Sequence, residues 1–505
     1  MRYLSLTIVI CFYCIASTAQ EVREKLDSLF ESIYKDHAFN GNVLVVEKGK
    51  EIYRREFGYA NVEDHQLNKA DTRFQLASVS KTFTATAILQ LKEKNKLKLD
   101  DPVQQYLPDF PLTGVTIRQL LQHTSGLQDY QIFEKPHRED TGRIFTNADI
   151  IPALKRYEMV LPPPGERWSY SNIGYGLLVL IIEECSGMSY PAYMERYIFR
   201  AAGMTHTYLA SALLRHPDPE RSVNYDFYGY APADLLRVDS LPRYRIPNTI
   251  LGGILGPGYV VSTTDDLLRF DEALYGNRLL RQETLEEAWT PGTLNNGQKA
   301  AMGWGSGQSY YGLGWNILRD TSIGKVVWHS GGAPGIVTVF LRNISRRQTV
   351  IVLDNVTHRN VHGNGINAMY LLNHRPPFPE KRSLASVYAQ TLVSGGPDLA
   401  TAQFNTLKRD TAHYYLDERE LNTQGLELLW NGYPALGLEA LKLNTLLFPG
   451  SWNVYDSYAA ALVINNRKDA AIAMYRLSVT MNPGNNEGRT ALQKLLEQMP
   501  QNKSR

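Results

Sequence analysis

The sequence has very few cysteines. It contains three in 505 residues, and two of them, Cys11 and Cys14, lie in an apolar segment at the start of the chain. If that segment is removed, Cys185 alone remains and no internal disulfide can form. Cys185 follows an apolar helical stretch without a polarising neighbour, which predicts a core residue rather than a reactive thiol.

Other absences exclude several classes of protein. The net charge is +2 and no Lys/Arg run stands out, which disfavours a nucleic-acid partner. The eleven histidines show no ligand spacing and no His-Glu-x-x-His occurs, so we expect no metal and no other cofactor. No serine has glycine both two before and two after it, which excludes the nucleophile elbow of α/β-hydrolases.

The first 19 residues are typical of a secretory signal. Arg2 precedes an apolar run from Leu4 to Ile15, and small residues follow it up to Ala19. We expect removal of residues 1–19 and export to the periplasm or medium. No later run of about 18 apolar residues exists, so no stable membrane insertion is expected after removal of the signal.

The pattern along residues 20–375 predicts one α/β (α+β) domain. A hairpin is expected at 41–59 and further strands are expected between 312 and 353, whereas the residues between them read mostly as helices. This order predicts an antiparallel sheet flanked by helices, plus a helical lobe. Residues 210–248 are Pro-, Asp- and Tyr-rich with poor periodicity and are expected to be an irregular insertion.

The tail has a repeat. Gly432 and Asn466 are 34 positions apart, as are Pro449 and Pro483, and the intervening segments read as helix–turn–helix. A 34-residue period of paired helices is the tetratricopeptide signature. We therefore expect an all-α tetratricopeptide-like domain at 416–505, which could bind a protein partner, and a connector at 376–415.

Ser78 and Lys81 form the first candidate catalytic pair. Ser78 precedes an apolar-periodic run, so it falls near a helix start with Lys81 on the same face one turn along. A nucleophilic serine needs a base in reach and positive potential where an oxyanion forms. Ser-x-x-Lys also occurs at Ser32 and Ser322, so the spacing alone is weak evidence.

Two further segments add to this pair. Tyr170-Ser171-Asn172 follows a Pro/Gly turn. His329-Ser330-Gly331 ends a strand expected at Val326–His329, and Gly332 follows. With their flanking phrases, these segments resemble the serine β-lactamase and DD-peptidase superfamily, in the branch of class C β-lactamases, D-aminopeptidases and family VIII esterases. The resemblance covers roughly residues 21–355 and implies a β-lactamase-like fold.

The resemblance also implies roles. Ser78 would be the acylated nucleophile, and Lys81 and Tyr170 would share the role of base, with the Lys81 ammonium lowering the pKa of the tyrosine. Asn172 would hold Lys81 and the substrate amide. His329, Ser330, Gly331 and Gly332 would line the substrate site, and the N–H groups of Ser78 and Gly332 would form the oxyanion hole.

His329 departs from the Lys-Thr-Gly that many β-lactamases and DD-peptidases carry. Histidine is mostly neutral at pH 7, whereas lysine holds a fixed charge that helps to bind the carboxylate of a β-lactam. We therefore expect a secreted serine hydrolase that acts on esters, amides or D-amino-acid peptides, rather than an efficient β-lactamase. The alternative is a non-catalytic penicillin-binding-like scaffold or peptidoglycan-fragment binder that recruits partners through the repeat tail.

Overall fold

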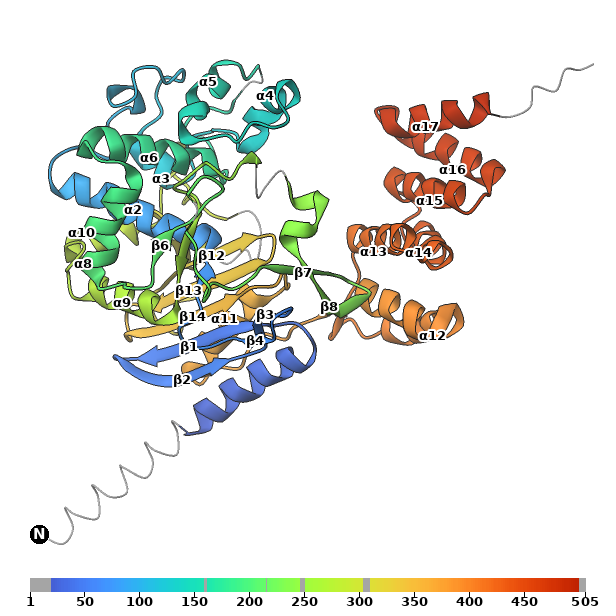
Figure 1. Cartoon of the computed structure of the whole chain (residues 1–505), viewed down its shortest axis with the longest axis horizontal. Helices are drawn as coiled ribbons and strands as arrows, with labels where there is room; N and C mark the ends of the chain where they lie inside the picture. Colours follow the sequence, from blue (N-terminus) through green and yellow to red (C-terminus); the bar gives the residue numbers. More distant parts are fainter. Residues whose placement is uncertain (1–19, 159–160, 215, 246–249, 303–308, 499–505) are drawn as a thin grey trace, which may run out of the picture. The chain divides into compact units, whose positions relative to one another are not determined.

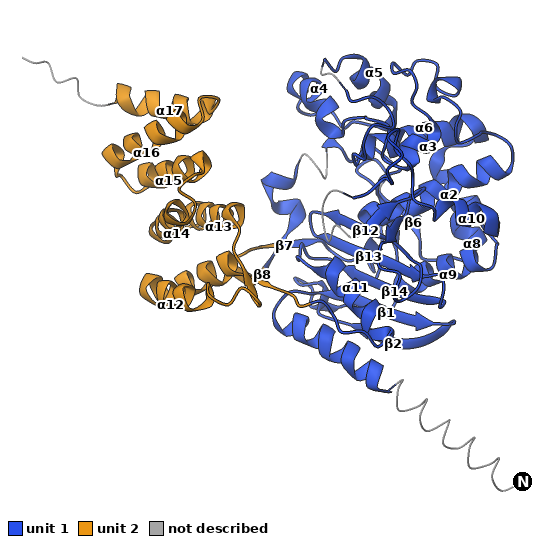
Figure 2. Cartoon of the chain, turned by 180° about the vertical axis from the view of Figure 1, so that it is seen from behind, with its two compact units in different colours: residues 1–226, 235–378 blue, residues 227–234, 379–505 orange. Residues whose placement is uncertain are grey.

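The computed structural model describes residues 20–158, 161–214, 216–245, 250–302 and 309–498 (Figure 1). The expected signal and residues 215 and 246–248 of the expected insertion lie outside these ranges. The chain divides into two compact units, the first made of residues 1–226 and 235–378 and the second of residues 227–234 and 379–505 (Figure 2). Among the described residues, no helix combines the length and apolar character needed to cross a membrane.

The first unit contains a seven-stranded antiparallel sheet in the order β10-β11-β12-β13-β14-β1-β2. Strand β1 pairs with β14 on one side and β2 on the other, so the sheet joins the two ends of the domain, as the sequence predicted. The strands are β1 (Gly41–Glu47), β2 (Lys50–Glu56), β10 (Ser309–Tyr311), β11 (Asn316–Leu318), β12 (Val326–Ala333), β13 (Ile336–Asn343) and β14 (Gln348–Asp354).

Alternating side chains of β1 enter two different cores. Val43 and Val45 pack in the core that also contains the N-terminal helix, residues 20–35, and α11 (Val361–Leu372). Leu44 and Val46 point to the opposite face. A sheet buried on both faces gives a three-layer arrangement, which confirms the expected sheet flanked by helices.

The core on the opposite face contains the helical lobe. Its central helices are α2 and α6, which pack together and are buried along most of their lengths. The helices of this lobe and its flanks are α2 (Ser80–Glu93), α3 (Ile117–Leu121), α4 (Glu134–Glu139), α5 (Ile150–Lys155), α6 (Asn172–Ser186), α7 (Tyr190–Met194), α8 (Arg200–Ala202), α9 (Thr264–Tyr275) and α10 (Gln282–Ala288).

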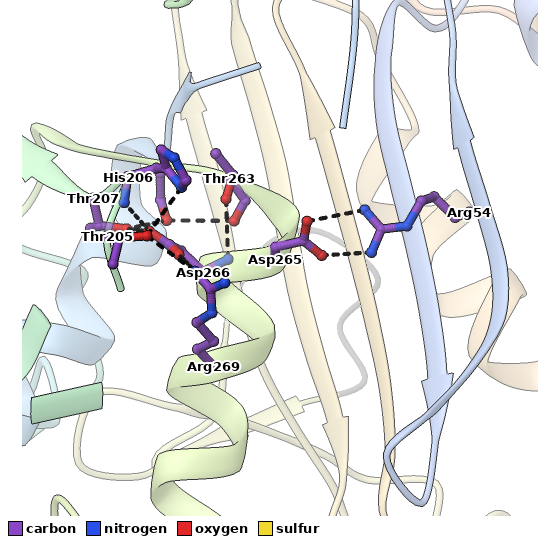
Figure 3. Close-up of polar contacts among 9 residues, drawn as sticks. Arg54, Thr205, His206, Thr207, Thr263, Asp265, Asp266 and Arg269 are labelled. Carbon is purple, nitrogen blue, oxygen red and sulfur yellow. Dashed lines mark hydrogen bonds and ion pairs between the residues drawn. The ribbon is translucent and has the colours of Figure 1, made fainter. Parts of the chain in front are cut away.

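A small three-stranded sheet leads into α2. Its order is β5-β9-β6, with β5 (Phe74–Gln75), β9 (Val260–Ser262) and β6 (Tyr208–Leu209). Asp266, in the first turn of α9, is fully buried and accepts hydrogen bonds from the backbone N–H of His206 and the hydroxyl of Thr207, at 2.7 and 2.8 Å (Figure 3). This carboxylate therefore ties the residues before β6 to α9.

The expected insertion is more regular than its composition suggests. Residues Tyr225–Tyr228 (β7) and Ala231–Arg237 (β8) form a β-hairpin whose two-residue turn contains Gly229. The sequence lacks strict alternation here, so its periodicity did not predict the strands. A second short hairpin joins β3 (Tyr59–Asn61) to β4 (Gln66–Leu67).

The second unit is almost entirely helical, as expected for the tail. Corresponding helices repeat every 34 positions, since α13 and α15 begin at Glu418 and Trp452, and α14 and α16 begin at Pro434 and Lys468. The expected connector contains a helix that kinks at Gly396, and a short strand pair, β15 with β16. The elements are β15 (Arg382–Ser383), α12 (Leu384–Leu407), β16 (Tyr414–Tyr415), α13 (Glu418–Trp430), α14 (Pro434–Leu447), α15 (Trp452–Ile464), α16 (Lys468–Met481) and α17 (Asn486–Glu497).

Candidate active site

Ser78 lies in a single 3-10 turn, Ala77–Val79, that continues directly into α2. The turn is held by Leu76, whose N–H donates to the carbonyl of Val260 at 2.8 Å and whose carbonyl accepts from Thr338 Oγ1 at 2.8 Å. Ala77 has φ +43°, in the left-handed region that residues with a Cβ rarely adopt. The backbone just before Ser78 is therefore strained and held in place by its neighbours.

Lys81 is fully buried, and its Nζ makes three contacts. It lies 2.7 Å from Asn172 Oδ1, 3.1 Å from the carbonyl oxygen of Pro257 and 3.1 Å from Ser78 Oγ. A neutral amine has two N–H bonds and one lone pair. Because the two carbonyl-type oxygens can only accept, they take the two N–H bonds of the neutral amine and leave its lone pair for the Ser78 hydroxyl, whereas the ammonium form donates to all three oxygens.

The surroundings of Lys81 favour that neutral form. Burial lowers the pKa of the Lys81 ammonium from 10.5 to about 7, and the negative charge of Asp129 opposes the shift. A lysine whose pKa lies near neutrality can exchange a proton with a hydroxyl group at physiological pH.

Tyr170 and Asn172 come from the start of α6. Ser171 caps this helix, because its hydroxyl accepts the N–H of Gly174 at 3.3 Å. The Tyr170 ring lies beside Lys81, with Nζ 4.7 Å from its centroid, and its hydroxyl makes a hydrogen bond with the Ser78 side chain. Ser78, Lys81, Tyr170 and Asn172 are thus brought together.

The pKa of Tyr170 shifts in the direction opposite to the one the sequence suggested. Burial raises it above its usual value, and the hydrogen bond with the Ser78 side chain only partly opposes this. We expected the Lys81 ammonium to lower it. That expectation was wrong, because the pocket desolvates the lysine as well and reduces the charge that would stabilise a phenolate.

Asp129 is a site residue that the sequence analysis missed. Its two carboxylate oxygens accept the backbone N–H of Asn172 at 2.9 Å and the Asn172 Nδ2 at 2.8 Å. This fixes the amide so that Asn172 Oδ1 faces Lys81. Asp129 follows by two residues the segment Leu120–Leu127, one of the flanking phrases that contribute to the family resemblance, and that proximity was the only available signal.

His123 is a second residue that was not singled out. Its Nδ1 accepts the backbone N–H of Ser171 at 3.2 Å, and its ring centroid is 4.2 Å from that of Tyr170. Burial lowers its pKa well below the ordinary value, so the ring is neutral. His123 therefore supports the segment that carries Tyr170.

His329 is buried in β12 and uncharged. Its Nε2 lies 2.9 Å from the Tyr311 hydroxyl, and Nδ1 lies 2.6 Å from the carbonyl oxygen of Ser330. Burial, with a smaller effect from the nearby Lys81, lowers the pKa of His329 to about 3. The side chain therefore brings no positive charge to the site at neutral pH.

The residues after His329 form the strand edge beside the catalytic turn. A Cβ on Gly331 would lie 2.2 Å from the carbonyl oxygen of Leu76, so only glycine allows β12 to approach the turn this closely. Ser330 is half-buried, whereas Gly332 is exposed and has open space where its Cβ would be. His362 Nε2 lies 3.0 Å from the Gly331 carbonyl oxygen. Because a carbonyl oxygen only accepts, Nε2 is the donor of this hydrogen bond.

A serine at a helix start, a buried lysine against its hydroxyl and a tyrosine beside both define a serine hydrolase site on a β-lactamase-like fold. The chain belongs to the β-lactamase family, whose model matches residues 26–392.

Its relatives include proteins that bind penicillin. Penicillin-binding protein 4* of Bacillus subtilis (strain 168) is 40% identical over 345 residues, which cover 66% of this chain and 72% of that protein. The crystal structure of a penicillin-binding protein from Bacillus halodurans matches with a TM-score of 0.56 and 25% identity, over 68% of this chain and 98% of that one. D-amino acid amidase from Ochrobactrum anthropi SV3 shares the fold, with a TM-score of 0.55 and 23% identity over 69% and 98% of the two chains.

Proposed function

We propose that this protein is a serine hydrolase that forms an acyl-enzyme on Ser78 and acts on an ester, an amide or a D-amino-acid peptide. The observation that carries the proposal is the arrangement around Lys81 Nζ, whose two N–H bonds are taken by Asn172 Oδ1 and the Pro257 carbonyl oxygen. Its lone pair is thereby directed at the Ser78 hydroxyl, 3.1 Å away.

In the acylation step, Lys81 Nζ takes the Ser78 proton while Oγ attacks the substrate carbonyl carbon. The negative charge on the carbonyl oxygen is stabilised by the backbone N–H groups of Ser78 and Gly332. When the intermediate collapses, the bond to the leaving group breaks and the leaving group needs a proton. Tyr170, which retains its proton because burial raises its pKa, gives that proton and regains one from the Lys81 ammonium.

Deacylation reverses these steps with water. Water loses a proton to Lys81, its oxygen attacks the acyl carbon, and the bond to Ser78 Oγ breaks as Oγ regains a proton. The products are a carboxylic acid and the free serine.

The neutral His329 supports the choice of substrate class. Both ring nitrogens of this buried imidazole are already in hydrogen bonds and it carries no fixed positive charge, so neutral ester or amide groups suit the strand edge better than a carboxylate. The relation to penicillin-binding protein 4* and the fold shared with D-amino acid amidase support the same range of substrates.

The test is covalent labelling. A fluorophosphonate probe and a fluorescent penicillin are expected to label the full chain, and Ser78→Ala is expected to abolish both labels and lower ester turnover about a thousandfold or more. Ser322→Ala is the matched control, because Ser322 belongs to another Ser-x-x-Lys match but is exposed. Turnover by Ser78→Ala within tenfold of the unmodified protein would overturn the assignment, and an absence of label and turnover in the unmodified protein would favour the scaffold alternative.

We further propose that the protein is exported and that its helical tail is a tetratricopeptide-like module for a protein partner. The N-terminal residues support export, and the 34-residue offset between α13 and α15 supports a tetratricopeptide-like tail. A mature N-terminus at Gln20 in the extracytoplasmic fraction would test the former. Capture of a partner by residues 379–505 that is lost on deletion of α16 and α17 would test the latter.

A further inference from the structure

A polar cavity lies beside the catalytic turn in the first unit. Its volume is about 400 Å³, and the residues used below line it: Gln75, His216, Arg221, Asn224, Arg237 and Tyr259. Most of its lining residues lie at 210–212, between 216 and 224, and at 237–239, in the region that the sequence analysis could describe only as an irregular insertion. Because Gln75, three positions before Ser78, also lines this cavity, the insertion is well placed to recognise part of the substrate.

The cavity is connected to the catalytic residues through the backbone. Gln75 belongs to β5 and is three positions before Ser78. Tyr259 is two positions after Pro257, whose carbonyl oxygen accepts from Lys81, and its own carbonyl oxygen accepts the N–H of Ala210 at 2.9 Å. The β5-β9-β6 sheet described above, anchored by Asp266, therefore supports both the cavity and the turn that carries the nucleophile.

Most charges around the cavity are already paired. Arg237 donates to both carboxylate oxygens of Asp239 at 3.1 and 2.9 Å. The carboxylate of Asp218 accepts from Arg73 at 3.1 Å and from the Tyr208 hydroxyl at 2.7 Å. These pairs leave no net charge to attract a ligand.

Arg221 differs from these paired charged groups. Within the ranges that the structure describes, its half-buried guanidinium has no ion pair and no side-chain hydrogen bond. Gln75 adds a second donor, because its Oε1 accepts from Asn224 Nδ2 at 2.9 Å, which leaves the Gln75 Nε2 group without a described partner. A guanidinium and an amide N–H₂ on one cavity wall are the donors that a carboxylate accepts.

We propose that this cavity binds a carboxylate on the substrate whose carbonyl is attacked by Ser78, with Arg221 as its counter-ion and Gln75 Nε2 as a second donor. The inference rests on the proposed hydrolase function and narrows its substrate class to acidic esters, amides or peptides. His329 brings no charge to the strand edge, whereas Arg221 supplies charge recognition away from it. His216, which also lines the cavity, stacks on the ring of Tyr208 with ring centroids 3.9 Å apart.

The test compares two substrates of equal length. One is the p-nitrophenyl monoester of glutaric acid, which carries a free carboxylate, and the other is its methyl-capped diester. Arg221→Gln is expected to lower the ratio of kcat/KM for the acidic substrate over the neutral one by about tenfold or more, since a charge-assisted hydrogen bond is lost. Arg221→Lys, which keeps the charge, is expected to restore part of the ratio.

Arg278→Gln serves as the matched control, because Arg278 is exposed, lies in the same unit and does not line the cavity. Added salt is expected to lower the ratio for the unmodified protein but not for Arg221→Gln. An unchanged ratio in Arg221→Gln overturns the proposal.

A second measurement separates this proposal from the proposed function. Binding of glutarate to full-length Ser78→Ala is measured by calorimetry, with and without Arg221→Gln, and requires no turnover. Weaker binding in the double variant supports the cavity even if no hydrolysis is found, in which case the hydrolase proposal alone fails. Equal binding in both proteins contradicts the carboxylate site.

Discussion

At the scale of single residues, the protonation state of Lys81 governs the chemistry. Burial brings its pKa to about 7, so the amine is protonated below that pH and cannot accept the Ser78 proton. We expect kcat/KM for a neutral ester to rise with pH, with a midpoint near pH 7. Lys81→Arg should remove this dependence and lower activity about a thousandfold, because arginine does not lose its proton.

The check on this prediction is a pH–rate profile between about pH 5.5 and about pH 8.5 with a non-ionisable substrate. A flat profile, or a midpoint near the pKa of a solvated lysine, would rule out a buried neutral Lys81 as the base. Stability measured over the same range distinguishes a catalytic midpoint from acid unfolding.

Asp129 gives a second prediction at this scale. Its negative charge raises the pKa of Lys81 and its oxygens orient Asn172, so Asp129→Asn should shift the midpoint of kcat/KM to lower pH. We also expect kcat to fall about tenfold, because the Asn172 amide is less well oriented. Asp140→Asn, at an exposed site, is the control and should leave the midpoint in place. A midpoint that stays put or rises in Asp129→Asn would show that Asp129 is only structural.

The residues of the site were predictable to the extent that they lie in short motifs. The spacing within each motif and the order of the motifs along the chain were enough to predict four residues, Ser78, Lys81, Tyr170 and Asn172. The structure brings these four side chains together. The direction of the Tyr170 pKa shift could not be predicted, because it depends on how deeply α2 and α6 bury Lys81 and Tyr170. Asp129 is 43 positions from Asn172, and a pairing across that distance has no local signature.

At the scale of elements, a buried ion pair joins α9 to the sheet. Arg342 on β13 donates to Asp271 on α9, which also accepts from Thr349 Oγ1 at 2.6 Å. Asp271→Ala leaves a buried guanidinium uncompensated and should lower the free energy of unfolding by about 3–5 kcal/mol. Thermal or denaturant unfolding of the variants provides the measurement.

Asp265→Ala, in the same helix, is the comparison for this variant. Asp265 pairs with Arg54 at 2.6 Å, but its side chain is 41% exposed, so solvent screens the interaction (Figure 3). Its loss should cost at most about 1 kcal/mol. Similar effects of the two substitutions would mean that burial does not determine the strength of these pairs.

The elements themselves were predicted where periodicity or capping was strong. Residues 41–47, within the expected hairpin, and 336–343, within the region 312–353 where strands were expected, are strands, and the Thr263 hydroxyl caps α9 by accepting the N–H of Asp266. The strand at 326 continues to Ala333, beyond the expected end at His329, because pairing with β13 compensates for two glycines of low strand propensity. The β7–β8 hairpin was missed since its aromatic residues do not alternate with polar ones.

At the scale of the whole molecule, the chain crosses between its units more than once. The hairpin tip, residues 227–234, belongs to the second unit, where the Gly229 N–H donates to Glu427 Oε2 at 3.2 Å and its carbonyl oxygen accepts from Gln390 at 3.0 Å. A chain that ends at Phe378 would leave this tip without those partners. We expect amide exchange in residues 225–237 to become about tenfold faster or more.

Hydrogen-exchange mass spectrometry of the full and shortened chains measures this directly. Exchange in α2, which is far from the cut in sequence, serves as the internal reference. Unchanged protection in the hairpin would mean that its own strand pairing, rather than the helices of the second unit, holds the tip.

The position of β1 between β2 and β14 has a consequence for synthesis. Asn40, just before this strand, donates to Asn355 Oδ1, a residue 315 positions later, and β1 itself lies between β2 and β14. A nascent chain can form the β1–β2 hairpin early, but one edge of β1 stays open until β14 has left the ribosome. Contacts of such long sequence separation fold slowly. Strand β1 is therefore translated early but completes its pairing late. The sheet stays incomplete until nearly the whole first unit has been made.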